Sequence, residues 1–233
     1  MDDSRTLYAG SSTRTAERVS AFLTKVYGWM FIGLGITAAV AYFVASSPAL
    51  TGALMANRLV FFALVVVELG LVFFLSARVE SLEPGTAAGL FVAYAALNGV
   101  TLSLILLIYT GASIAMTFVV TGAMFGALAV YGTTTSRSLA GAGQFFFMGL
   151  IGLVLASVVG MFWHSDALQF LITVVGVVVF TGLTAWDAQR LKQMALTLPD
   201  GHAGAYAVVG ALSLYLNFVN LFLMLLRLQG RRD

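Results

Sequence analysis

The sequence of 233 residues contains no cysteine, three prolines, two histidines and very few charged residues. The lack of cysteine excludes disulfide bonds and thiolate chemistry, although it says little about the compartment. Charged residues make up 9% of the chain, whereas soluble domains contain roughly a quarter. Hydrophobic residues make up 60%, and the mean hydropathy is +0.97. Too few polar residues remain to cover a water-soluble core, so the composition predicts an integral membrane protein.

Seven apolar runs are each close to the ~20 residues that cross a hydrocarbon core of ~30 Å. They are Phe22–Ser46, Leu59–Ala77, Thr86–Ile108, Ser113–Tyr131, Ala142–Trp163, Leu168–Met194 and Ala205–Leu226. The runs are continuous rather than alternating, which favours helices over barrel strands. The first run is too long for the core of a signal peptide, so we expect it to remain as a span.

The sequence therefore predicts an all-α membrane protein with seven transmembrane helices. We expect a mobile polar tail over 1–20, a transmembrane domain over 21–228 and a short basic tail over 229–233. The break between the third and fourth runs is very short, so those two helices should form a tight antiparallel hairpin. The Gly122–Gly126 pair of the fourth run should pack closely within one bundle, as small residues do in lipid, with a dimer face as the alternative. We expect a monomer or a weak oligomer.

The distribution of Lys and Arg predicts the orientation, because these residues accumulate on the cytoplasmic side. Eight lie in the amino tail and the even-numbered loops, and four lie on the opposite side. The eight are Arg5, Arg14, Arg18, Lys25, Arg78, Arg137, Arg190 and Lys192, and the four are Arg58, Arg227, Arg231 and Arg232. We expect a cytoplasmic amino terminus and a carboxyl terminus on the opposite side. The net charge of +2 is spread over loops and tails, so a nucleic-acid partner is not expected.

Polar side chains inside the apolar runs are the best functional signal, because an ionisable group at the bilayer centre costs at least ~2.5 kcal/mol. Glu68 lies in the middle of the second run, and Asp187 lies near the end of the sixth. Three amides, Asn98, Asn217 and Asn220, lie in the third and seventh runs and also need partners. Glu68, Asn98 and Asn220 are candidates for an ion path.

The basic partner of Asp187 has two alternatives. Arg78 ends the second run and can snorkel toward the level of Asp187. Arg190 is the i, i+3 neighbour of Asp187, which supports a local pair instead. Glu68 lies about 15 Å from Arg78 along a helix, too far to pair with it. For Glu68 the alternatives are a protonated carboxyl bonded to a neighbouring helix and a direct role in ion passage.

Enzymatic signals are weak. The sequence contains no HExxH, no GxSxG and no phosphate-binding glycine loop. His164 and His202 should lie in loops on opposite faces, so a shared metal site is not expected. We expect no enzyme and no resident cofactor, with an intramembrane hydrolase as the remaining enzymatic alternative.

Five stretches carry a resemblance to a known family. They are VYGWMFIGL at 26–34, NRLVFFALVVVELGLVFFLSARV at 57–79, YTGASIAMTFVVTGAMFGALAVYGTTTSRSL at 109–139, FTGLTAWDAQRLK at 180–192 and GALSLYLNFVNLFLMLLR at 210–227. Together they resemble the Bax inhibitor family, also called the transmembrane Bax inhibitor motif family, and most closely its bacterial inner-membrane branch. The resemblance implies that six helices surround the seventh. It also implies a pH-sensitive calcium leak, with calcium as a transient occupant.

The same resemblance implies a latch made of two aspartates on the sixth and seventh helices. The first maps onto Asp187, and the basic partner maps approximately onto Arg78. The second falls on Asn217, where this sequence reads LYLNFVNLF and the family pattern reads LYLDFINLF. An amide removes the carboxylate repulsion and the shared proton of an acid pair. We therefore expect a latch of Asp187 and Asn217 with a weaker or shifted pH response, and weaker cation affinity at Asp187.

Two functions follow as alternatives. The first is passage or sensing of calcium, protons or another cation. The second is a non-conducting regulatory protein that binds a membrane protease or another membrane partner through its amino tail.

Overall fold

The computed structural model describes residues 3–163, 165–198 and 203–231, without the side chains of residues 3–14, 58 and 161. Within these ranges it contains helices and connecting turns and no strand. Seven helices are long and apolar enough to cross a membrane: α1 (Asp3–Ala45), α3 (Arg58–Ala77), α4 (Pro84–Leu102), α5 (Gly111–Thr134), α6 (Ala140–Phe162), α7 (Asp166–Thr197) and α8 (Ala203–Gln229). The prediction of an all-α membrane protein with seven spans is confirmed.

Local chemistry explains where the helices begin. Proline occupies the first turn of α4 and of a short additional helix, α2 (Pro48–Ala56), where no amide hydrogen is needed. The side chains of Asn57, Thr110 and Ser165 accept backbone hydrogen bonds at the starts of α3, α5 and α7. The sequence did not predict α2. Ser103–Leu107 belong to the third span, as the sequence predicted, but form a 3₁₀ helix, η1, that continues α4.

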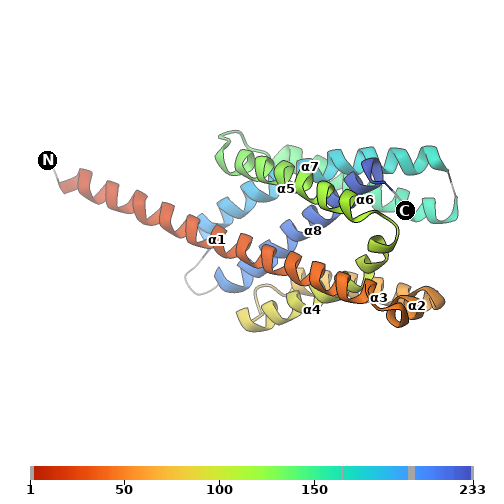
Figure 1. Cartoon of the computed structure of the whole chain (residues 1–233). Helices are drawn as coiled ribbons and strands as arrows, with labels where there is room; N and C mark the ends of the chain where they lie inside the picture. Colours follow the sequence, from red (N-terminus) through yellow and green to blue (C-terminus); the bar gives the residue numbers. More distant parts are fainter. Residues whose placement is uncertain (1–2, 164, 199–202, 232–233) are drawn as a thin grey trace.

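Helix α1 begins much earlier than the sequence predicted. Residues 1–20 were expected to form a mobile tail, whereas the helix already begins at Asp3. Among the residues with described side chains, Thr15–Ala45 of this helix is long and apolar enough to cross a membrane. Figure 1 shows the amino-terminal turns of α1 extending well beyond the other helices. The domain boundaries at 20 and 228 stay predictions.

Helix α8 lies at the centre of the bundle, between α1, α3 and α4 on one side and α5 and α7 on the other (Figure 1). Within its apolar window 67% of the residues are buried, against 39% or fewer in each other span. Five of the six other spans, α1, α3, α4, α5 and α7, pack on the last helix, so its predicted enclosure is present except at α6. Helix α6 is the outermost, because it packs mainly on α7.

The expected hairpin of the third and fourth spans is wrong. Helix α4 packs on α1, α3 and α8, whereas α5 packs on α7 and α8. The η1 segment and the turn after it carry the chain from one side of α8 to the other. The short loop therefore joins two helices that have no extended contact within the described residues.

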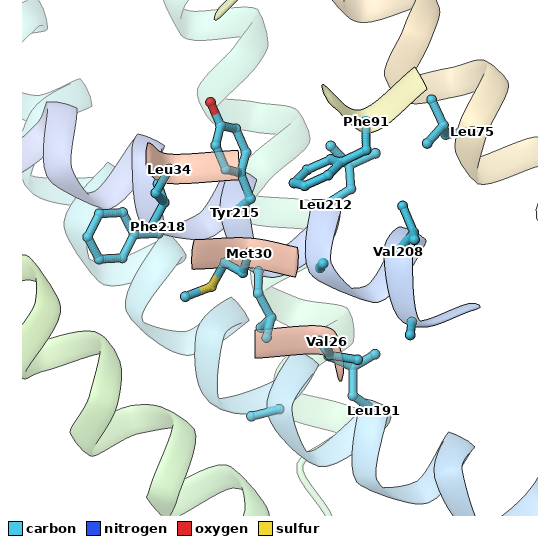
Figure 2. Packing of buried hydrophobic residues seen from close by; sticks show 14 of the residues in the cluster. Val26, Met30, Leu34, Leu75, Phe91, Leu191, Val208, Leu212, Tyr215 and Phe218 are labelled. Atoms are coloured by element: carbon cyan, nitrogen blue, oxygen red, sulfur yellow. The ribbon is translucent and has the colours of Figure 1, made fainter. Parts of the chain in front are cut away.

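The core around α8 is built from aliphatic and aromatic side chains that interlock (Figure 2). Val26 and Met30 of α1 lie beside Leu191 of α7 and Leu212 of α8, all of them 1% exposed or less. The rings of Phe91 and Tyr215 meet edge-on, 5.8 Å apart. Helices in lipid are held by such packing, because lipid tails are as apolar as the side chains.

The close helix approaches occur at glycines that the sequence did not single out. Gly122 and Gly126 are exposed on α5, and a Cβ at either would meet no atom within 4 Å. Their predicted close packing within the bundle is wrong. At Gly99 of α4, by contrast, a Cβ would lie 2.8 Å from the backbone oxygen of Thr37 in α1. This contact sets the distance between α4 and α1.

Candidate functional site

Asp187 and Asn217 are in direct contact between α7 and α8. The Nδ2 of Asn217 donates a hydrogen bond to Oδ2 of Asp187 at 2.7 Å. Each residue is 6% exposed. The sequence could not decide whether the two lie at the same level. The structure brings them together, as a polar contact between two helices that are otherwise held by apolar packing.

Arg190 is the basic partner of Asp187. Its Nη2 lies 3.1 Å from Oδ1 of Asp187, which confirms the local i, i+3 alternative. The guanidinium also lies 5.0 Å from the ring centre of Trp186, on the same helix. Arg78 is exposed at the end of α3 and is not among the partners of Asp187 in the described part of the chain.

The pairing of Asp187 with Arg190 is incomplete. Within the described residues, Oδ1 of Asp187 and Nε of Arg190 are buried and make no well-aligned hydrogen bond. The nearby guanidinium compensates the charge of Oδ1 without occupying its lone pairs. Oδ1 of Asp187 is therefore a buried acceptor without an aligned donor.

A cavity of about 390 Å³ connects this contact with Glu68. It lies among α3, α4, α6, α7 and α8, and we call it the polar cavity. Its polar lining consists of Glu68, Tyr94, Trp186, Asp187, Arg190, Ser213, Asn217 and Asn220. The two buried carboxylates, which are 119 positions apart in the sequence, thus face one space.

Glu68 is held by neutral donors. It is 8% exposed in the middle of α3. Asn98 of α4 donates from Nδ2 to Oε2 at 3.2 Å, and the Thr101 hydroxyl donates to Oε1. Within the described residues no cation lies at ion-pairing distance from Glu68. The sequence predicted that both Asn98 and Glu68 need polar partners, and the structure pairs them with each other.

Tyr215 and Thr37 extend this contact and were missed in the sequence. The Tyr215 hydroxyl donates to Oδ1 of Asn98 at 3.0 Å and lies 2.6 Å from Oγ1 of Thr37. Thr37 in turn donates to the carbonyl of Ala95 at 2.8 Å. A tyrosine among apolar residues gives no signal of this kind, because its ring alone explains its burial.

Asn220 lines the polar cavity but bonds to its own helix. Its Nδ2 donates to the carbonyl of Leu216 at 2.8 Å. No group of three or more His, Cys, Asp or Glu side chains that could hold a metal occurs in the described residues. His164 and His202 lie outside them.

Comparison with known proteins gives matches along nearly the whole chain. The family model described as inhibitor of apoptosis-promoting Bax1 matches residues 19–233. The inner membrane protein YbhL of Escherichia coli K12 is 48% identical over 217 residues, which cover 92% of this chain and 93% of YbhL. An uncharacterized protein of Borreliella burgdorferi is 44% identical over 213 residues, which cover 91% of this chain and 92% of that protein. The uncharacterized protein RP147 of Rickettsia prowazekii is 38% identical over 237 residues, which cover 100% of this chain and 99% of that protein.

Proposed function

The chain belongs to the Bax inhibitor family, and on that premise we propose that it passes cations across the inner membrane through the polar cavity. Asp187 and Asn217 form the latch that closes this path, and Arg190 compensates the charge of Asp187. Calcium or protons are transient occupants, and we propose neither an enzymatic activity nor a resident cofactor. The name of the E. coli relative supports the inner membrane. The Lys and Arg distribution supports a cytoplasmic amino terminus and a carboxyl terminus on the opposite side.

One observation carries this proposal. The buried carboxylate of Asp187 bonds across the α7–α8 contact and opens onto the same cavity as Glu68. Intramembrane acids typically mark ion pathways, and carboxylate and amide oxygens are the ligands that hard cations prefer. Oδ1 of Asp187 is buried and makes no aligned hydrogen bond within the described residues, so it becomes an acceptor for such a cation when the latch opens and exposes it.

The latch of this chain should respond weakly to pH. Two facing carboxylates repel when both are ionised and can share one proton. Asn217 instead donates to an ionised Asp187, and its own oxygen can accept from a protonated Asp187. The contact therefore persists in both protonation states of Asp187.

Calcium flux into proteoliposomes across a range of pH tests this account. We expect a shallow pH dependence for the wild type. In Asn217→Asp the flux should rise as the pH rises, because the second carboxylate then ionises against Asp187. Asn220→Asp adds a carboxylate to the same cavity three residues further along α8 but outside the Asp187–Asn217 contact, so its pH dependence should stay shallow whatever the size of its flux. Coinciding wild-type and Asn217→Asp curves would refute the latch, and the absence of flux in all three proteins would refute conduction.

A second candidate function rests on the shape of α1. The amino-terminal turns of this helix extend beyond the bundle (Figure 1), where a membrane protease or another membrane partner has access to them. Deleting residues 1–14 tests this role and leaves Arg18, whose Nη2 donates to the carbonyl of Leu198 at 3.2 Å. A regulatory partner would be lost by this deletion, whereas cation flux would survive it.

A further inference from the structure

A chain of hydrogen-bonding groups runs from the polar cavity across the bundle to α1. It consists of Glu68, Asn98, Tyr215 and Thr37 and ends at the carbonyl of Ala95; we call it the crossing chain. Its four contacts measure 3.2, 3.0, 2.6 and 2.8 Å. The Thr37 end reaches a second, apolar cavity of about 270 Å³ among α1, η1, α5 and α8.

The crossing chain has fewer hydrogens than contacts when Glu68 is ionised. Each contact needs one hydrogen between its two heavy atoms. The hydroxyls of Thr37 and Tyr215 supply one each. The amide of Asn98 donates to only one of its two neighbours, because its other end is a carbonyl oxygen. The ionised carboxylate and the Ala95 carbonyl supply none. Three hydrogens therefore serve four contacts.

In the present orientation of the Asn98 amide, the shortage falls on Thr37. Asn98 donates to Glu68, and Tyr215 donates to Asn98. The single hydrogen of Thr37 must then serve both Tyr215 and the Ala95 carbonyl.

A 180° flip of the Asn98 amide exchanges its oxygen and nitrogen without changing the space it fills. The contact that lacks a hydrogen is then the one between Asn98 and Glu68. The amide nitrogen then donates to Tyr215, Tyr215 donates to Thr37, and Thr37 donates to the Ala95 carbonyl. The amide oxygen now faces Oε2 of Glu68, and this contact needs a hydrogen on the carboxyl group. A protonated Glu68 is thus the form that completes all four contacts.

We propose that Glu68 is a proton-binding site, and that the bound proton completes the crossing chain and clamps α3, α4, α8 and α1 together. The ligand is a proton from the aqueous phase, received at Oε2. The other oxygen, Oε1, lies against the Thr101 hydroxyl, which also bonds the carbonyl of Leu97 on its own helix at 3.1 Å. This role does not depend on cation passage, because it follows from the hydrogen bonds alone.

The surroundings of Glu68 agree with a neutral carboxyl. The titratable groups that face it are Tyr94 from α4, Tyr215 from α8 and, across the polar cavity, Asp187 and Arg190 from α7. Arg190 is engaged by Asp187. Helix α2, which also packs on α3, has no titratable residue. An unpaired charge buried in a lipid-embedded bundle is costly.

Infrared spectroscopy of the protein in lipid tests the site directly. The chain has four glutamates, and Glu17, Glu80 and Glu83 are exposed. A ¹³C label on the glutamate carboxyls therefore isolates Glu68 as the buried one. At neutral pH we expect a protonated carboxyl band that shifts in D₂O and disappears in Glu68→Gln. It should also shift in Tyr215→Phe, two contacts away. Carboxylate bands alone, or a band that Tyr215→Phe leaves in place, would overturn the proposal.

Thermal unfolding in detergent gives a second test. In Glu68→Gln the new amide nitrogen supplies the hydrogen that the proton supplies, so the melting temperature should match the wild type. Glu68→Leu supplies no such hydrogen and should lower the melting temperature by about 2–4 °C. An equal loss in both variants would contradict the proposal. Neither test uses flux, so their failure is distinguishable from a failure of cation passage.

Discussion

The two buried carboxylates face one cavity but differ in what stabilises them. Asp187 has a cation on its own helix and an amide on the next. Glu68 has only neutral donors, in a chain of contacts that joins four helices. The first site joins α7 and α8 by a single hydrogen bond, whereas the second distributes its contacts over α1, α3, α4 and α8.

This difference indicates that the α7–α8 contact can open, whereas the crossing chain holds its helices together. The side chain of Arg190 is 41% exposed, so it can follow Asp187 toward water at little electrostatic cost. Every member of the crossing chain is buried or half-buried, and breaking one contact strands a polar group among apolar side chains. The α7–α8 contact is therefore suited to gating, and the crossing chain to clamping.

The largest effect is expected from removing the latch itself. Asp187→Ala deletes the bond to Asn217 and the pair with Arg190. A hydrogen bond to a charged group contributes ~1.5–3 kcal/mol, so the ratio of open to closed protein should rise about tenfold or more. Calcium flux into proteoliposomes at neutral pH measures this. Asp166→Ala, an exposed acid in the first turn of the same helix, should leave the flux unchanged. A flux in Asp187→Ala at or below the wild-type level would break the comparison.

Separating α4 from α1 should weaken the clamp next. In Gly99→Ala the new Cβ would lie 2.8 Å from the backbone oxygen of Thr37 and 2.8 Å from Cβ of Val40, and neither atom can turn away. We expect a loss of about 1–3 kcal/mol in the free energy of unfolding, measured with denaturant in detergent. Gly89→Ala, on the same helix, meets no atom within 4 Å, and should be neutral or stabilising by up to ~1 kcal/mol. Equal effects of both substitutions would show that α1 does not depend on this approach.

Removing one hydroxyl tests the crossing chain with less disturbance. Tyr215→Phe deletes two of its four contacts and keeps the ring between Phe91 and Tyr94. Hydrogen bonds between membrane helices contribute ~0.6 kcal/mol on average, so the free energy of unfolding should fall by about 1 kcal/mol. Tyr94→Phe is the control, since the Tyr94 hydroxyl makes no hydrogen bond within the described residues. A loss in Tyr94→Phe as large as in Tyr215→Phe would remove the basis for a clamp.

The sequence predicted the spans much better than the contacts among them. Apolar runs determine how many helices cross the membrane, because each must hide its backbone from lipid. Which helices touch depends on where close approach is allowed, and a glycine reveals this only in three dimensions. Gly122 and Gly126 have the expected spacing but line an open groove beside α1, whereas Gly99 has no small-residue pattern around it and lies in close contact with α1.

The residues of the candidate site likewise divide into those that the sequence identified and those that it did not. Asp187, Asn217 and Glu68 were identified because polar groups are rare in apolar runs. Tyr215 and Thr37 were not identified. The burial of a tyrosine is explained by its apolar ring, and a threonine hydroxyl in a span can bond to the backbone of its own helix, so neither residue signals a contact with another helix. The partner of Asp187 was left open between Arg78 and Arg190, since both lie within reach of a long side chain.

The smallest effect, and the sharpest test of the latch, concerns these two arginines. Arg190→Gln removes the charge beside Asp187, and the pair contributes at most ~1 kcal/mol because the arginine is partly exposed. Flux should therefore rise by no more than about fivefold. Arg78→Gln removes a charge from the end of α3 and should leave flux unchanged, because Asn217 and Arg190 already contact Asp187. The reverse result, a rise in Arg78→Gln alone, would mean that Arg78 reaches Asp187 and holds the latch closed in the protein in lipid. The charge at the latch would then come from another helix, and α3 would belong to the gate as well as to the clamp.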